Sequence, residues 1–145
     1  MKNNFAEEYR KEQEIRARYD AADSEAGKND AREEHRAWAT EVDAKGAGYA
    51  RCFRSYREAR DRDNEYIDIS EVSDYRNEAE LVETLRKVGI THFTFSSTWS
   101  GAVESAWEFQ KAGCTLEGLV EINSQHRDYL TGEYEKRHGY LFRVN

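Results

Sequence analysis

The chain has no proline, two cysteines and one methionine among its 145 residues. Proline breaks helices and usually makes up about 5% of a protein, so its absence favours long helices over a linker-rich architecture. Cys52 and Cys114 lie far apart, with no second cysteine near either. This spacing fits neither a disulfide framework nor a metal site, so we expect a reducing, cytoplasmic setting and no metal.

Long apolar runs and known catalytic motifs are missing as well. No run approaches the ~20 apolar residues that span a bilayer, and the opening MKNNFAEEYR lacks the apolar stretch of a signal peptide. The patterns GxGxxG, GxxxxGK[ST], HExxH and GxSxG do not occur. We therefore expect a protein with no membrane contact, no cofactor and no enzymatic activity.

Charge is abundant but unevenly placed. Charged residues make up 35% of the chain and apolar residues 38%, so part of the chain should be exposed helix. Residues 1–64 carry 14 basic and 15 acidic side chains, whereas residues 65–145 carry 8 and 14. The net charge of −7 disfavours general binding to nucleic acid, because phosphates need cationic partners. An acidic chain suits a basic protein surface, although such charge also serves solubility alone.

The segment 90–123 is predicted to form a strand, a helix and a second strand. Alternation in THFTF places Phe93 and Phe95 on a buried face and His92 and Thr94 on the other. Hydroxyl residues at 96–100 then indicate a turn and a helix cap.

Helical spacing follows the turn. We expect an apolar stripe that includes Val103, Trp107 and Phe109 to face the sheet, and Gly113 to end the helix. Trp107 should then be mostly buried, and its truncation should cost ~3–5 kcal/mol.

After Gly113 the period returns to two. The pattern places Leu116, Gly118, Val120 and Ile122 inward, and Glu117 and Glu121 outward. A final strand over 139–144 should pair with this one as an antiparallel hairpin, with Arg143 facing Glu117 or Glu121. Residues 124–138 are predicted to form a long, functional or mobile loop between the two strands.

The remaining pattern is mostly helical. Helices are expected over about 4–22, 30–45 (capped by Asn29 or Asp30) and 49–64, then a short strand over 65–70. A further helix should begin after Asn77, where Glu80 completes a capping pattern, and end at Gly89. The predicted fold class is α+β: a helical segment over 1–64 and an α/β domain over 65–145, with a small mixed sheet of about four strands covered by two helices.

Two features could bind anions. Arg51, Arg54, Arg57 and Arg60 form a slanted stripe beside Tyr49 and Tyr56, which is typical of a solvated face but also fits nucleic-acid contacts or salt bridges. The turn from Ser96 to Ser100 precedes a helix, where free N–H groups attract phosphate, although ordinary capping explains the same residues.

The scattered titratable residues give weaker signals. His92 on a strand near Glu121 could form a metal or acid–base pair, but a hydrogen-bonded structural histidine is several times more common. Glu104 and Glu108 share a helix face and are expected to be exposed. Cys114 has no basic neighbour in sequence, so we do not expect a nucleophile there.

The segments THFTFSSTW, SAWEFQKAGCTLEGLVEIN and GYLFRVN resemble a family of small accessory proteins from plasmids and mobile elements of gut bacteria, over residues 75–145. The resemblance implies a setting in which small inhibitors of host defence, including anti-CRISPR proteins, are common. By analogy, we expect an inhibitor that binds a Cas nuclease or another nucleic-acid-handling protein. The alternatives are a nucleic-acid-binding regulator that uses the arginine stripe and a small enzyme or binder of a phosphate-bearing ligand at Ser96–Ser100. The residues expected to contact a partner are Glu104, Glu108, Glu117, Glu121, Arg51, Arg54, Arg57 and Tyr56.

Overall fold

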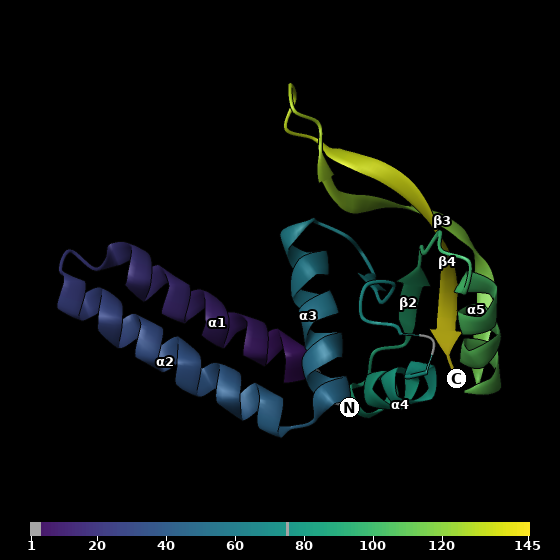
Figure 1. Ribbon diagram of the computed structural model, residues 1–145, viewed down its shortest axis with the longest axis horizontal. Coiled ribbons are helices and arrows are strands. Elements are labelled where there is room, and N and C mark those ends of the chain that lie inside the picture. The colour runs from purple at the N-terminus through teal and green to yellow at the C-terminus, as the bar shows by residue number, and fades with distance from the viewer. Residues whose placement is uncertain (1–3, 75) are drawn as a thin grey trace.

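The computed structural model describes residues 4–74 and 76–145; residues 1–3, which begin the opening segment discussed above, and residue 75 lie outside that description. The expected α+β class is confirmed: helices come first and a four-stranded mixed sheet with further helices follows (Figure 1). In chain order the elements are α1 (Asn4–Ala21), α2 (Glu25–Ala44), α3 (Ala47–Asp61), β1 (Ile67–Asp68), α4 (Glu78–Val88), β2 (His92–Phe95), α5 (Ala102–Lys111), β3 (Cys114–Arg127) and β4 (Tyr134–Val144). None of the described helices combines the length and apolarity that a membrane span requires.

The first two helices lie side by side and extend away from the sheet (Figure 1). The predicted start of α2 near Asp30 is wrong, because the Ser24 hydroxyl accepts a hydrogen bond from the Gly27 N–H at 3.1 Å and starts the helix there. The third helix matches its prediction within a few residues.

Two buried glutamates of α1 hold the three N-terminal helices together. Glu12 is fully buried and its carboxylate lies 3.1 Å from the Arg57 guanidinium of α3. Glu8 accepts hydrogen bonds from the Trp38 indole at 2.8 Å and from Lys45 at 2.6 Å. Because α3 also contacts β1 and α4, the helical hairpin is joined to the sheet through α3.

The sheet has the order β1-β2-β4-β3, with β1 parallel to β2 and the other pairs antiparallel. The predicted hairpin of the last two strands is confirmed, and Arg143 lies 3.6 Å from Glu117 across it. The predicted long loop is wrong. Both strands continue outward as a projecting hairpin, which leaves only residues 128–133 as the connection (Figure 1).

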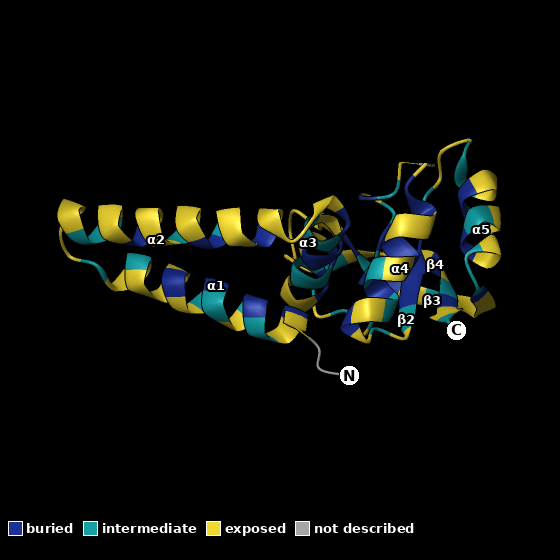
Figure 2. Cartoon of the chain, turned by 90° about the horizontal axis from the view of Figure 1, so that it is seen from below, coloured by how far each residue is buried: buried dark blue, intermediate teal, exposed yellow. Residues whose placement is uncertain are grey.

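The core under α5 is built on Phe109. Its ring centroid lies 5.1 Å from that of Phe93, 5.2 Å from that of Phe95 and 5.5 Å from that of Phe142. Buried positions therefore line the inner side of the helix, as the dark bands on α5 and the strands show (Figure 2). Thr94, on the opposite side of β2, is also fully buried and donates a hydrogen bond to Asp68 at 2.8 Å.

The expectation that Trp107 packs against the sheet is wrong. Its side chain is 58% exposed, and Val103 is 76% exposed. Phe109, another member of the predicted stripe, does face the sheet, together with Ser105. The predicted stripe is broader than the face that packs, so the side of the helix with Val103 and Trp107 remains in solvent.

The expected alternation along β3 fails at one residue. A register shift between Leu116 and Gly118 makes Glu117 the extra residue of a bulge, so Leu116 pairs with Phe142 and Gly118 with the next residue, Leu141. Leu116 therefore lies on the opposite face from Gly118, and it is half-exposed rather than buried. Beyond the bulge Ile122 is buried, as predicted, whereas Gly118 is exposed and Val120 only half-buried, so the inward prediction is wrong for these two residues.

The predicted glycine ends of α4 and α5 are confirmed, but the predicted side-chain cap at the start of α4 is wrong. Gly89 ends α4 in the left-handed region with φ 80°, and Gly113 follows α5 with φ 101°. Asn77 stands at the N-cap of α4, but its side chain bonds the backbone of Asp74 and Val72 instead of capping the helix.

The packing of α5 gives a direct stability prediction. Phe109→Ala should lower the free energy of unfolding by about 3–5 kcal/mol, because it empties the centre of an aromatic cluster. Trp107→Ala should lower it by less than about 1 kcal/mol, because that ring is largely in water. Urea denaturation of the two variants measures both values, and an equal loss for Trp107→Ala would show that α5 packs through its other face.

Candidate functional site

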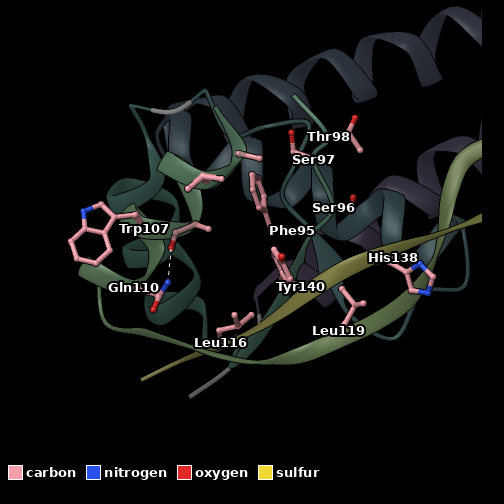
Figure 3. Close-up of a pocket in the computed structure, with 13 residues that line it drawn as sticks. Phe95, Ser96, Ser97, Thr98, Trp107, Gln110, Leu116, Leu119, His138 and Tyr140 are labelled. Carbon is pink, nitrogen blue, oxygen red and sulfur yellow. Dashed lines mark hydrogen bonds between the residues drawn. The ribbon is translucent and has the colours of Figure 1, made fainter. Parts of the chain in front are cut away.

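An apolar hollow lies between α5 and the β3–β4 hairpin. Its volume is about 580 Å³. Figure 3 shows side chains from β2, the following turn, α5 and both hairpin strands around it. The hollow is lined by Phe95, Ser96, Ser97, Thr98, Ala102, Val103, Ala106, Trp107, Gln110, Leu116, Leu119, His138 and Tyr140.

Large apolar side chains lie exposed around this hollow. Leu119 is 61% exposed and Tyr140 48%, and Leu116, Val103 and Trp107 add to the same surface. In Figure 3 the indole of Trp107 stands at the rim and points away from Phe95. Contiguous apolar surface of this kind is uncommon on monomeric soluble proteins and marks interaction sites.

A buried hydrogen bond sets which face of α5 borders the hollow. The Ser105 hydroxyl donates to the Glu78 carboxylate of α4 at 2.8 Å, and both residues are buried. Glu78 lies in the first turn of α4, where the helix dipole favours a negative charge. With Ser105 and Phe109 facing inward, the helix turns Val103 and Trp107 outward.

The hairpin supplies the other wall because of its bulge. Leu119 pairs directly with Tyr140, so the two side chains share a face, and Leu116 joins them from the near side of the bulge. This pairing was missed in the sequence, because strict alternation placed Leu119 outward with the glutamates. The sequence did offer one signal: Leu119 is an apolar residue, next to Gly118, at a position that strict alternation assigns to solvent.

One acidic side chain borders the hollow. Glu104, which is exposed, and Glu108, which is half-buried with Lys111 at 3.3 Å, lie on the side of α5 away from Val103 and Gln110, because a helix turns by about 100° per residue. Glu121 is exposed on β3 opposite His138, which lines the hollow. Of these three predicted partner residues, only Glu121 lies beside the apolar depression.

The fourth predicted acid, Glu117, is engaged within the chain. Its carboxylate lies 2.7 Å from the His92 ring and 3.6 Å from Arg143. His92 therefore contacts Glu117 and not Glu121. Within the described residues, no group of three or more His, Cys, Asp or Glu side chains is arranged to hold a metal ion.

The arginine stripe lies on α3, away from the hollow, and its members contact neighbouring side chains. Arg51 lies 3.7 Å from Asp74, and Arg54 lies 3.2 Å from Glu58 and 3.6 Å from Glu71. Arg57 contacts Glu12, as described above, and Arg60 stacks on the Tyr9 ring. Tyr56 packs against the rings of Phe5 and Tyr9. Arg57, Arg60 and Tyr56 therefore join α3 to α1, whereas Arg51 and Arg54 contact acids of α3 and of the segment after β1.

The turn from Ser96 to Ser100 borders the hollow and uses several of its polar groups internally. The Ser96 N–H donates to the Ser70 hydroxyl at 2.7 Å, and the Ser96 carbonyl accepts from Arg137 at 3.0 Å. The helix that follows begins after Gly101 with Glu104 in its first turn. A phosphate there would meet this carboxylate.

A family model described as "Domain of unknown function (DUF7698)" matches residues 51–144. The match begins within α3 and includes the whole sheet, both helices beside it and the hollow, but not α1 and α2. No curated protein and no solved structure matches the chain.

The two cysteine thiols should be unreactive in the folded chain. Burial raises the pKa of Cys52 to about 12 and that of Cys114 to about 11, so almost no thiolate is present at pH 8. A chromogenic disulfide reagent should therefore label neither thiol until denaturant is added. Rapid labelling of one thiol in the native protein would contradict this assignment and would reopen the case for a nucleophile.

Proposed function

The chain belongs to the DUF7698 family, whose description names no activity, and we propose that it is a non-enzymatic binding protein that docks on the basic surface of a nucleic-acid-handling protein. The observation that carries this proposal is the exposed apolar hollow with the Glu121 carboxylate beside it. It combines an anchoring surface with a negative charge at one edge.

The hollow has the composition of a protein interface. Aromatic and aliphatic side chains make up most of its lining, and polar residues such as Ser97, Thr98 and Gln110 complete it, which resembles the hydrophobic core and polar rim of known interfaces. Trp107 and Tyr140 are of the residue types that most often dominate binding energy. A partner surface with an apolar anchor between lysine or arginine side chains would complement it.

The resemblance of residues 75–145 to accessory proteins of mobile elements directs the choice of partner. A CRISPR effector nuclease presents a basic channel that ordinarily holds nucleic acid, and an acidic protein of this size can compete for it. We therefore propose an anti-CRISPR activity in which the chain blocks access to a Cas nuclease. The cationic groups of α3 take no part, because acids and aromatic rings of the chain already contact them.

The test uses purified Cas nucleases loaded with guide RNA, in a pull-down at low salt with target cleavage measured alongside. At least one effector should bind the chain and lose cleavage activity, and added salt should weaken binding because the rim contacts are electrostatic. Binding to none of the effectors, or binding that leaves cleavage intact, would contradict the proposal.

Two matched variants assign the binding to the hollow. Trp107→Ala should weaken binding about tenfold or more, as expected for an aromatic anchor. Tyr19→Ala, which removes an aromatic ring from the far helical hairpin, should leave the affinity unchanged. Equal affinity of Trp107→Ala and the unchanged chain would place the interface elsewhere.

A further inference from the structure

β3 is an edge strand of the sheet, and most of its outer side is open. It runs over 14 residues and, among the described strands, pairs only with β4. The residues from Thr115 to Leu119, and Glu121, are exposed or half-exposed. An unpaired edge of this length offers backbone N–H and C=O groups to another strand.

The side chain of Asn64 already forms hydrogen bonds with one residue of this edge, Asn123, in the way that a neighbouring strand would. The Asn64 amide, just beyond α3, accepts a hydrogen bond from the Asn123 N–H at 2.9 Å and donates to the Asn123 carbonyl at 3.0 Å. Both backbone groups of Asn123 therefore point away from β4. The orientation of Asn123 therefore determines which residues along the regular part of the ladder direct their N–H and C=O groups away from β4.

The alternation places the next outward groups at Glu121 and Leu119. Pairing is regular from Gly118 to Asn123, so residues two apart direct their N–H and C=O to the same side. No hydrogen bond from the described residues reaches the backbone of Leu119 or Glu121 on that side. The side chains of these two residues lie on the face that carries the hollow.

We propose that this edge binds an extended segment of the partner as an added β-strand. The inference rests on the proposed function and specifies how the partner is held. The residue opposite Leu119 is apolar and enters the hollow beside Trp107, whereas the residue two positions away is lysine or arginine and lies opposite Glu121. The one residue between them lies opposite Val120 on the other face. The next residue on that face lies opposite Gly118, where no atom lies within 4 Å of an added Cβ.

A second copy of the chain is a poor occupant of the same edge. Two β3 strands paired about a two-fold axis at Leu119 would place Glu117 opposite Glu121 twice. Like charges directly opposite each other destabilise a strand pair. The edge therefore favours a cationic strand over itself.

The first measurement is amide hydrogen exchange of the free chain by NMR. The Asn123 amide should be protected by Asn64, whereas the Leu119 and Glu121 amides should exchange rapidly. Protection of Leu119 and Glu121 in the free chain would show that the edge is covered, and would overturn the proposal.

The second measurement uses the peptide acetyl-Lys-Thr-Lys-Thr-Leu-Thr-Leu-amide as the probe, because its lysines and leucines share one face. At up to about 1 mM, the weak end of measurable affinity, it should slow exchange at Leu119 and Glu121. N-methylation of its leucines and lysines should abolish binding, because their N–H groups face β3. N-methylation of its threonines should not. Absence of protection, or equal binding of the two methylated peptides, overturns strand addition.

A matched pair of variants separates the backbone from the charge. Glu121→Ala should weaken peptide binding about two- to fivefold through loss of the carboxylate. Glu121→Pro should weaken it about tenfold or more, because it also removes the outward N–H without removing a bond to β4. Unchanged protection of the Asn123 amide verifies that both variants keep the strand. Equal affinities of the two variants would overturn the proposal.

The outcomes distinguish this inference from the proposed function. If the peptide pairs with β3 but no effector is inhibited, the edge site stands and the anti-CRISPR activity fails. If an effector is inhibited equally by Glu121→Ala and Glu121→Pro, the function stands and strand addition fails.

Discussion

The hydrogen bond from Ser105 to the buried carboxylate of Glu78 determines the character of the surface beside the sheet. It joins α5 to α4 and turns Phe109 into the aromatic cluster. A buried carboxylate without this donor would lose much of its compensation for desolvation. Because the same rotation directs Trp107 and Val103 outward, one internal contact both completes the core and displays an apolar face.

The order of elements was predictable because local patterns decide it. Alternation at 92–95, helical spacing after it and a positive-φ glycine at Gly113 each depend on neighbouring residues alone. The face of α5 was not predictable, because Trp107 and Phe109 are both large and apolar. The contacts that select between them, the Ser105–Glu78 hydrogen bond and the phenylalanines of β2 and β4, come from other parts of the chain. The helix start at Ser24 was missed because a connector composition concealed an ordinary cap.

The candidate site was accessible to sequence reasoning only through Glu121. Of the acidic residues predicted to contact a partner, Glu121 lies beside the hollow, whereas Glu104 and Glu108 lie on the side of α5 away from it. The apolar part, Leu119 and Tyr140, depends on a bulge at Glu117 and on the cross-strand register, neither of which local sequence specifies. The arginines of α3 looked available because their partners, such as Glu12, lie far away in the chain.

The central claim is that α5 and the hairpin present one apolar surface that the chain itself leaves uncovered. Hydroxyl-radical footprinting of the free chain, read by mass spectrometry at several protein concentrations, tests it most directly. The account predicts that Trp107 and Tyr140 are oxidised rapidly at every concentration, while Phe109 and Trp38 are protected. Protection of Trp107 and Tyr140 to the level of Phe109 would contradict it, because the surface would then be buried and unavailable to a partner.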